Sequence, residues 1–389
     1  MKNENLAAVL KKNAMLIILV LVYLFFAILT KGGIFSPSSF TELINQNAYV
    51  YILGAGMLMC MLTGGNIDLS CGSFVCLLGA FGGVFMIVNG MSTGLSIVLL
   101  LLIGLAYGSL LGFLIAYVHI PPWIATLAGY LSFRGLGTSI LSSNSTTGSL
   151  APFPVSFQNM FYGRVFPSEK GVFNLPCFIF GLVAAALVVF VVFHTRSSRL
   201  AKGYEADSVR AAAMKSGIGA AAIILVMTQL SLDGGIPTTL LWVAGIILIY
   251  SFITSKTTIG RHFYVVGGNM EAARLSGVNT RRIMFLAYLN MAVLTSIASF
   301  TVVARSQSAY ADVGKNFEMD AISACVVGGV SASGGAGTVL GMVIGATLIG
   351  VINLGMSLIS LDANYQRVVK GFVLLAAVVF DILSQKKQK

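Results

Sequence analysis

Charged residues are scarce in this sequence. Asp, Glu, Lys and Arg make up 10% of its 389 residues, while hydrophobic residues make up 57%. Because a soluble domain carries about a quarter charged residues, this chain has too little polar surface to cover a water-exposed globule. Its three histidines are far apart, and it has no HExxH motif, no Walker A lysine and no nucleophile elbow, so no common catalytic motif is present. The sequence predicts a polytopic membrane protein without an enzymatic site of its own.

Cysteine pairs and concentrated positive charge are also missing. The five cysteines lie inside or beside apolar runs without a CxxC pair: Cys60, Cys71, Cys76, Cys177 and Cys325. We expect them to be small buried residues that form neither disulfides nor a metal site. Basic residues outnumber acidic ones by 24 to 13, but they are scattered between apolar stretches. This dispersion argues against a nucleic-acid partner, and we expect no cofactor in this chain.

Long apolar runs are what the sequence does contain. A helix needs roughly 20 apolar residues to cross the hydrocarbon core, and helices satisfy their own backbone hydrogen bonds there. The predicted spans lie at 14–30, 47–63, 70–89, 94–118, 121–141, 176–194, 216–232, 238–254, 283–304, 319–334, 338–358 and 366–384, about twelve in all. The first lacks a cleavage pattern and reads as a retained span. The Gly-rich or short spans 121–141 and 319–334 are the candidates for broken or re-entrant segments.

The positions of Lys and Arg orient these spans. Most of the 24 fall in segments that are cytoplasmic if the N-terminus is inside, as the positive-inside rule requires. The fold class is therefore an all-α transmembrane helical bundle with both termini cytoplasmic. Two connections are long. The outer one, 141–174, is read as a solvated connection or, alternatively, as a lid or docking surface; the inner one covers 255–282.

The inner connection contains a predicted short helix over 269–275. Asn269 is a suitable N-cap, Glu271 suits the positive end of a helix, and Gly277 suits its C-terminus. Such a helix on a cytoplasmic loop could take force from a soluble partner; the alternative is an ordinary amphipathic loop helix. The candidate coupling residues are Gly267, Gly268, Asn269, Glu271, Ala272, Ala273, Arg274 and Gly277.

A second group of polar residues lies near membrane depth, in the stretch 63–73. Asp68 is either a functional residue within the membrane or, like Ser70, a cap for the helix that begins there. Arg134 is the basic residue placed deep inside a span. We therefore hypothesise an ion pair between Asp68 and Arg134 that stabilises or gates the bundle.

Glycine-rich stretches form the third pattern. The segment 326–338 contains two double glycines, and Gly104, Gly108 and Gly112 recur four apart. Small residues at this spacing allow helices in membranes to pack closely. We expect a helix break within 326–338 and a close helix contact along 104–112.

Four stretches together resemble one family. They are TGGNIDLSCGS at 63–73, IPPWIATLAGYLSFRGLG at 120–137, GRHFYVVGGNMEAARLSGVN at 260–279 and ISACVVGGVSASGGAGTVLGMVIGATLIGVINLGMSL at 322–358. The sequence resembles the permease subunits of bacterial ATP-binding-cassette importers for monosaccharides, the ribose, xylose and galactose group. Residues 271–273 match the Glu-Ala-Ala signature of such permeases.

The resemblance implies one permease domain, 1–389, with about ten family spans. Two further helices near 178–232 look like the longer xylose or multiple-monosaccharide subgroup. It also implies a multi-pass location in the bacterial plasma (inner) membrane, a homodimer or paired permease, and an extracytoplasmic sugar-binding protein. Cytoplasmic ATPase subunits would bind ATP and hold the helix around Glu271, with the coupling loop at 255–282. The alternative is an ion-coupled secondary transporter of a small polar solute.

A sugar path needs amides that bind hydroxyl groups and flat aromatic faces. The candidates for the path or its gate are Asn66, Asp68, Ser70, Trp123, Arg134, Asn290 and Asn353, with Asn45, Asn47 and Tyr130 as further hydroxyl-binding or aromatic residues. Each amide is equally suited to a hydrogen bond between helices.

Overall fold

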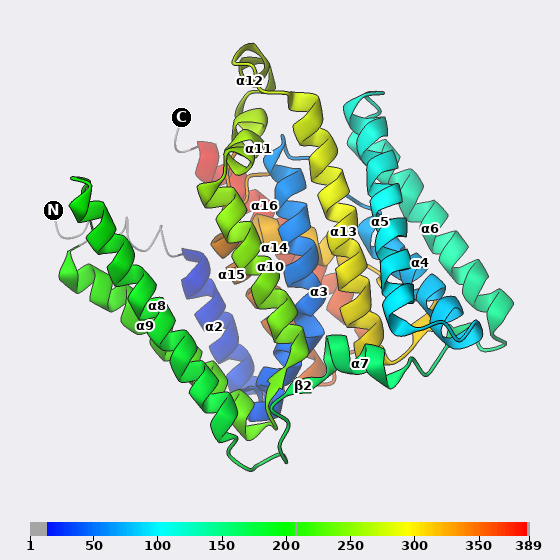
Figure 1. Ribbon diagram of the computed structural model, residues 1–389, viewed down its shortest axis with the longest axis horizontal. Helices are drawn as coiled ribbons and strands as arrows, with labels where there is room; N and C mark the ends of the chain where they lie inside the picture. The colour runs from blue at the N-terminus through cyan, green and yellow to red at the C-terminus, as the bar shows by residue number, and fades with distance from the viewer. Residues whose placement is uncertain (1–13, 207, 387–389) are drawn as a thin grey trace.

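The computed structural model describes residues 14–206 and 208–386, and its architecture is an all-α bundle (Figure 1). The longer helices are α2 (Ala14–Leu29), α3 (Pro37–Leu62), α4 (Cys71–Gly83), α5 (Thr93–Ala116), α6 (Pro122–Asn144), α8 (Leu175–Ala201), α9 (Val209–Leu232), α10 (Thr238–Lys256), α13 (Thr280–Ser306), α15 (Val339–Leu358) and α16 (Ala363–Lys386). The shorter ones are α7 (Val155–Tyr162), α11 (Thr258–Gly268), α12 (Met270–Leu275) and α14 (Phe317–Val327). The expected fold class is confirmed.

Two short antiparallel strand pairs join distant parts of the chain. Strand β1 (Ser149–Leu150) pairs with β4 (Ala309–Tyr310), and β2 (Arg164–Val165) pairs with β3 (Ile236–Pro237). Figure 1 shows β2 and α7 at one end of the bundle and α12 at the opposite end. These two ends are called the α7 end and the α12 end below.

Helix α3 lies at the centre of the bundle. It begins with Ser36 as N-cap, whose hydroxyl accepts a hydrogen bond from the Ser39 amide, and with Pro37 in the first turn, both favourable at a helix start. Nearly all of its residues from Ala48 to Leu62 are buried, and α10, α13, α14 and α15 pack around it. A helix that is apolar on every side belongs in such a core.

Each of the expected spans overlaps a helix, but not every one of these helices is both long and apolar enough to cross a membrane. Seven helices within the described residues are long and apolar enough to cross a membrane: Cys71–Val88, α5, α8, α9, α10, α13 and α15. The first of these combines α4 with the π-helical turn Val84–Val88. The N-terminal helix α2 is shorter. The expectation about the two termini concerns residues 1–13 and 387–389, which lie outside the described residues.

The two spans expected to be irregular differ. Helix α6 runs unbroken through 121–141, whereas 319–334 is only partly helical, because α14 ends at Val327. With 11 residues, α14 is about 16 Å long, roughly half of the hydrocarbon core. The expected break within 326–338 is confirmed. The apolar residues beyond Val327 form a connection to α15 instead of a further helical turn.

Helices α4 and α14 begin where two non-helical segments meet inside the bundle. Residues 63–70 lead into α4, and residues 307–316 lead into α14. A methyl group on Gly72 would overlap the Glu318 carboxyl group and the Gly314 carbonyl oxygen, and one on Gly314 would overlap the Gly72 carbonyl oxygen. The first turn of α4 is therefore in direct contact with the backbone just before α14 and with the Glu318 side chain in the first turn of α14.

The outer connection 141–174 is not simply solvated. It folds into α7, whose Phe157 and Phe161 are almost fully buried and pack edge-on or tilted against Phe300 of α13. The prediction of a solvated connection holds for 142–147 and 166–173, which are largely exposed, but not for α7, because phenylalanines spaced four apart on this short helix pack on α13. The five cysteines are buried, as predicted, and each has a free thiol.

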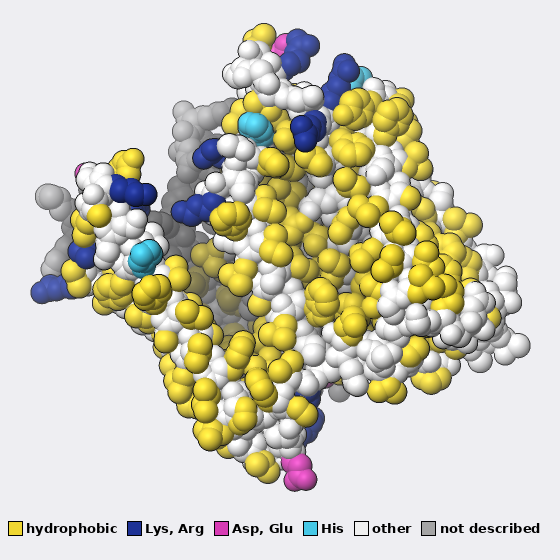
Figure 2. All heavy atoms as spheres, viewed as in Figure 1, with side chains coloured by type: hydrophobic (Ala, Val, Ile, Leu, Met, Phe, Trp, Pro, Cys, Tyr) yellow, Lys and Arg dark blue, Asp and Glu magenta, His cyan; other side chains and the backbone are white. Residues whose placement is uncertain are grey.

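Helices α8 and α9 form a hairpin at the side of the bundle. Within the described residues, α8 packs chiefly on α9, and α9 contacts α3 and β3. In Figure 1 this green hairpin meets the bundle near the α7 end and diverges from it towards the α12 end. Figure 2 shows hydrophobic side chains across the middle of the visible face, with Lys and Arg gathered around α12 and the diverging end of the hairpin.

Candidate functional site

Helix α12 has the caps that were expected from the sequence. The Asn269 side chain accepts a hydrogen bond from the Ala272 amide at 2.9 Å, and Gly277 follows the helix with a φ of +83°. Ala273 is fully buried, so it fixes the helix to the bundle. The predicted helix over 269–275 is confirmed, with α12 covering Met270–Leu275.

The opposite face of α12 is open. Glu271 and Arg274 form an ion pair of 2.6 Å in which both side chains are about two-thirds exposed, and Leu275 is 81% exposed. Sequence reasoning did not single out Leu275. Its position four residues after Glu271 places it on the same helix face, which is the signal that could have identified it.

Beneath α12, glycines from three separate stretches pack backbone against backbone. We define this glycine junction as Gly64, Gly65, Gly267, Gly334 and Gly335. A methyl group on Gly267 would overlap the Leu62 carbonyl oxygen, and one on Gly334 would overlap the backbone of Gly64. The Gly335 amide donates a hydrogen bond to that same Leu62 carbonyl at 3.2 Å. The end of α3, the end of α11 and the connection after α14 are thereby in contact.

A cavity of about 450 Å³ adjoins the glycine junction at the α12 end. Its walls come from residues within four segments: 63–66, 115–122, 270–274 and 280–284. It includes Asn66, His119 and both members of the Glu271–Arg274 pair. The cavity therefore brings together Glu271 and Arg274 of α12 and Asn66 of the 63–73 stretch, whereas Asp68 and Ser70 do not line it.

Asp68 and Ser70 form a buried polar group at the start of α4. Asp68 Oδ1 accepts hydrogen bonds from the Ser70 amide at 2.8 Å and from the Ser70 hydroxyl at 2.5 Å. The Ser70 hydroxyl also lies 2.6 Å from the hydroxyl of Tyr107 on α5. Asp68 thus binds the residue from which α4 begins, in keeping with its interpretation as a cap.

The hypothesised ion pair between Asp68 and Arg134 is not formed. Arg134 instead donates two hydrogen bonds from Nη1, to the carbonyl oxygens of Ala311 at 2.8 Å and Val313 at 2.7 Å. These carbonyls belong to the non-helical segment that leads into α14, where no helical amide reaches them. Arg134 therefore binds backbone carbonyl groups rather than a carboxylate. The predicted ion pair between Asp68 and Arg134 is wrong for this structure.

The remaining path candidates lie apart from one another. Asn290 accepts a hydrogen bond from the Tyr250 hydroxyl and so joins α13 to α10, while Asn353 is buried within α15. Asn47 joins α3 to α15 through the Ala346 carbonyl at 2.7 Å. Trp123 is 58% exposed near the start of α6. Of the predicted amides and aromatic residues, Asn66 is the one that lines the cavity beside α12.

No group of three or more His, Cys, Asp or Glu side chains that could hold a metal ion occurs within residues 14–206 and 208–386.

Comparison with known proteins gives relatives along most of the chain. A family model described as branched-chain amino acid transport system / permease component matches residues 39–378. The chain is 33% identical to the xylose transport system permease protein XylH of Haemophilus influenzae, over 96% of each chain. It is 30% identical to the ribose import permease protein RbsC of Escherichia coli K12, covering 91% of this chain and 89% of that protein. It is 27% identical to the fructose import permease protein FrcC of Rhizobium meliloti, covering 94% and 84%. No solved structure matches.

Proposed function

The chain belongs to the branched-chain amino acid transport system / permease component family, and from this premise we propose that it is the membrane-spanning subunit of an ATP-binding-cassette importer for monosaccharides. Its similarity to permeases named for xylose, ribose and fructose supports a sugar as the transported solute. Xylose or a mixture of monosaccharides is the preferred substrate, since the xylose permease aligns over 96% of both chains. The comparisons do not favour an ion-coupled transporter.

The family and the apolar helices place the protein in the bacterial inner membrane as a multi-pass subunit. Its energy then comes from separate ATPase subunits at the cytoplasmic face, and its sugar from a binding protein outside. We assign the α12 end to the cytoplasm, because the Lys and Arg side chains gathered there follow the positive-inside rule.

One observation carries the proposal: the open face of α12 and the glycine junction form one continuous unit. Glu271 and Leu275 are available to a partner. Gly267, a few residues before them, is in backbone contact with Leu62 at the end of α3. Because backbone groups in van der Waals contact cannot absorb a displacement as a flexible side chain can, a movement of α12 is passed to α3.

The same displacement reaches the connection before α15. The Tyr264 hydroxyl on α11 donates a hydrogen bond to the Gly337 carbonyl at 3.0 Å, and Gly335 binds Leu62. ATP-driven movement of α12 would therefore shift the ends of α3 and α15 together. We propose that this shift opens the cavity beside α12 as the cytoplasmic exit of the sugar path, with the Asn66 amide available to sugar hydroxyls.

We further propose that two copies of the chain pair in the membrane. The cavity beside α12 lies at the α5–α6 connection, and α6 exposes large apolar side chains at Trp123, Leu131 and Leu136. A second copy against α6 would convert the open cavity into an enclosed path. Cross-linking between α6 helices of differently tagged copies tests this arrangement.

The α8–α9 hairpin is proposed to be an addition to the common family bundle.

Co-purification tests the coupling role of α12. The tagged chain is purified in mild detergent from cells that make the whole transport system, and the accompanying proteins are identified by mass spectrometry. We expect a P-loop ATPase with the wild type and its loss with Glu271→Arg and with Leu275→Glu, since both changes alter the open face without touching buried Ala273.

The control is Leu200→Glu, which introduces the same charge at an exposed leucine near the end of α8. This variant should retain the ATPase. If no ATPase accompanies the wild type even after cross-linking in intact membranes, the importer assignment fails. If the ATPase remains bound in both α12 variants, the assignment survives but the docking role of α12 does not.

A further inference from the structure

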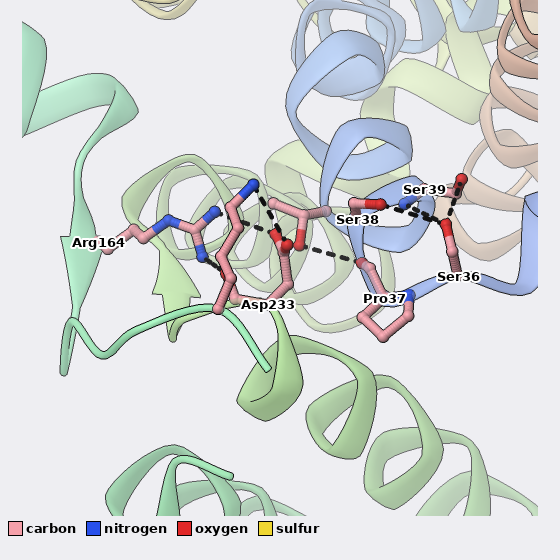
Figure 3. Close-up of polar contacts among 8 residues, drawn as sticks. Ser36, Pro37, Ser38, Ser39, Arg164 and Asp233 are labelled. Atoms are coloured by element: carbon pink, nitrogen blue, oxygen red, sulfur yellow. Dashed lines mark hydrogen bonds and ion pairs between the residues drawn. The ribbon is translucent and has the colours of Figure 1, made fainter. Parts of the chain in front are cut away.

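The α8–α9 hairpin is fixed to the bundle at one end. Figure 3 shows Arg164 and Asp233 close to the first turn of α3, where Ser36 and Ser39 interact. Asp233, just after α9, binds the Arg164 guanidinium at 3.0 Å and lies 3.5 Å from Lys170 Nζ. An apolar cluster including Cys177 and Leu230 lies nearby in the hairpin. We call this contact region the hairpin root.

At the other end, the hairpin leaves a cavity of about 610 Å³ next to α10. The cavity is lined by His194, Ser198, Arg199 and Lys202 of the α8 end, by Tyr204, and by Lys256 at the end of α10. We call it the basic slot. It brings together three basic side chains from the ends of two helices that do not otherwise pack closely.

These three cations lack an acidic partner in the part of the chain that the structure describes. No hydrogen bond or ion pair within 4 Å involves the Arg199, Lys202 or Lys256 side chain among residues 14–206 and 208–386. Glu205, in the nearby connection, pairs with none of them. Like charges gathered around one opening repel one another, so the slot is suited to a ligand that supplies negative charge.

One helical turn further from the basic slot, α8 and α10 each carry an exposed phenylalanine. Phe190 lies one turn before His194 and stacks on its ring at 5.6 Å between centroids, and Phe252 lies one turn before Lys256 on the same helix face. Both phenylalanines are more than 60% exposed. A ligand with a charged head and an apolar tail would therefore find basic side chains at the slot and exposed aromatic side chains one turn away on the same two helices.

We propose that the basic slot binds an anionic phospholipid of the cytoplasmic leaflet. Its phosphate oxygens contact Arg199, Lys202 and Lys256, and its acyl chains lie between α8 and α10. Basic residues between membrane helices at the cytoplasmic interface are suited to such headgroups. The assignment to the cytoplasmic leaflet rests on the proposed function, which orients α12; the binding chemistry does not.

Native mass spectrometry of the full chain from nanodiscs tests this proposal. The nanodiscs contain equal amounts of phosphatidylglycerol and phosphatidylcholine, and the ratio of the two lipids retained on the released protein is measured. The slot variant carries Arg199→Gln, Lys202→Gln and Lys256→Gln. The control variant carries Arg210→Gln, Arg261→Gln and Arg282→Gln, which removes the same charge from exposed residues outside the slot.

We expect the wild type and the control to prefer phosphatidylglycerol, and the slot variant to lose that preference by about tenfold or more, because the three basic side chains that would attract an anionic headgroup are removed. An unchanged ratio in the slot variant, or an equal loss in the control, would overturn the proposal. So would a photo-cross-linker at Tyr204 that captures the ATPase rather than lipid in cell membranes. The nanodiscs contain no ATPase, sugar or binding protein, so failure here is distinct from failure of the importer assignment.

Discussion

Helices α8 and α13 have the same length, 27 residues each. They differ in how hydrophobic they are and in how much of each is buried within the chain. The most apolar 18-residue window of α8 is the more hydrophobic of the two, yet 17% of it is buried within the chain, against 61% for α13. In a membrane, lipid-facing helices must be apolar, whereas a buried helix can carry small and polar residues that pack on its neighbours. In this pair, the more hydrophobic helix is the one that the rest of the chain leaves uncovered, and the helix richer in small and polar residues lies in the interior.

We expect the largest loss of stability from substitutions in the glycine junction, which lies in the densely packed interior of the bundle. We expect Gly267→Ala to destabilise the bundle by about 1–3 kcal/mol or more, because the new methyl group would overlap backbone atoms that cannot rotate away. Gly268→Ala is the matched control, since nothing lies within 4 Å of its new methyl group. Site-resolved labelling of Cys60 and Cys325 during heating measures the difference, and equal effects of the two changes would contradict the packing argument.

The contact between α5 and α13 should be nearly as sensitive. A methyl group on Gly108 would lie 2.9 Å from Leu289 Cα and 2.8 Å from Ala292 Cβ. Gly108→Val should therefore push the two helices apart at a cost of about 1–3 kcal/mol. The same substitution at Gly217 of α9, which faces open space, should change stability by less than about 0.5 kcal/mol. Denaturation in detergent compares the stability of the two variants. A larger loss of stability for the Gly217 variant would contradict the conclusion that α5 and α13 are the more closely packed helices.

A smaller effect is expected at the hairpin root. Asp233→Asn removes the charge that Arg164 and Lys170 share, and because Lys170 is 70% exposed and Arg164 28%, we expect a local loss of about 1 kcal/mol after solvent screening. Cys177 should then react with thiol reagents faster while Cys60 and Cys325 stay protected. Asp312→Asn, in a more exposed pair with Lys315, is the control and should leave all three unchanged. Uniform acceleration would mean that the hairpin and the bundle unfold as one unit.

Acidification should give the smallest effect, again confined to the root. Burial opposes ionisation of Asp233, but hydrogen bonds from Thr41 and Arg164 and the charges of Arg164 and Lys170 outweigh it and lower the pKa of this carboxyl group. Its stabilisation is therefore complete above the unfolded-state pKa of about 3.9 and is lost as the pH falls through the lower folded-state pKa. Hydrogen exchange at 230–236, corrected for intrinsic rates, should stay constant from pH 7 to about pH 5 and rise below about pH 4. The Asn variant should show no such step.

The sequence predicted the long apolar helices well because their hydropathy is a local property. Helix α15 covers 339–358 against an expectation of 338–358, and the Asn269 cap placed α12 correctly. Hydropathy could not locate the end of α14, because valines and small residues continue past Val327 into the glycine connection. What ends the helix is a turn at Gly328 and Gly329: Gly329 has a φ of +82°, and the amides of Gly329 and Val330 donate to the carbonyl oxygens of Val326 and Cys325.

The sequence identified residues of the candidate site but not which of them lie together in the folded chain. The residues of α12 and the 63–73 stretch were identified from caps and charges, yet their shared cavity depends on contacts across the bundle. The partner of Arg134 could not be inferred either. A lone arginine within a span suggests a carboxylate, but carbonyl groups of a distant non-helical segment are equally good acceptors, and sequence does not reveal where such a segment will lie.

The contact between Gly72 and Gly314 has an electrostatic consequence. The first turn of α4 meets the backbone just before α14 and the Glu318 side chain, so the positive ends of two helix macrodipoles lie close to the same small volume. Neither helix start has a side-chain cap of its own. Asp68 precedes one start and Glu318 lies in the first turn of the other. Carboxyl oxygens carry partial negative charge even when the acid is protonated, so these two buried acids place negative charge density beside two positive helix ends that would otherwise repel each other.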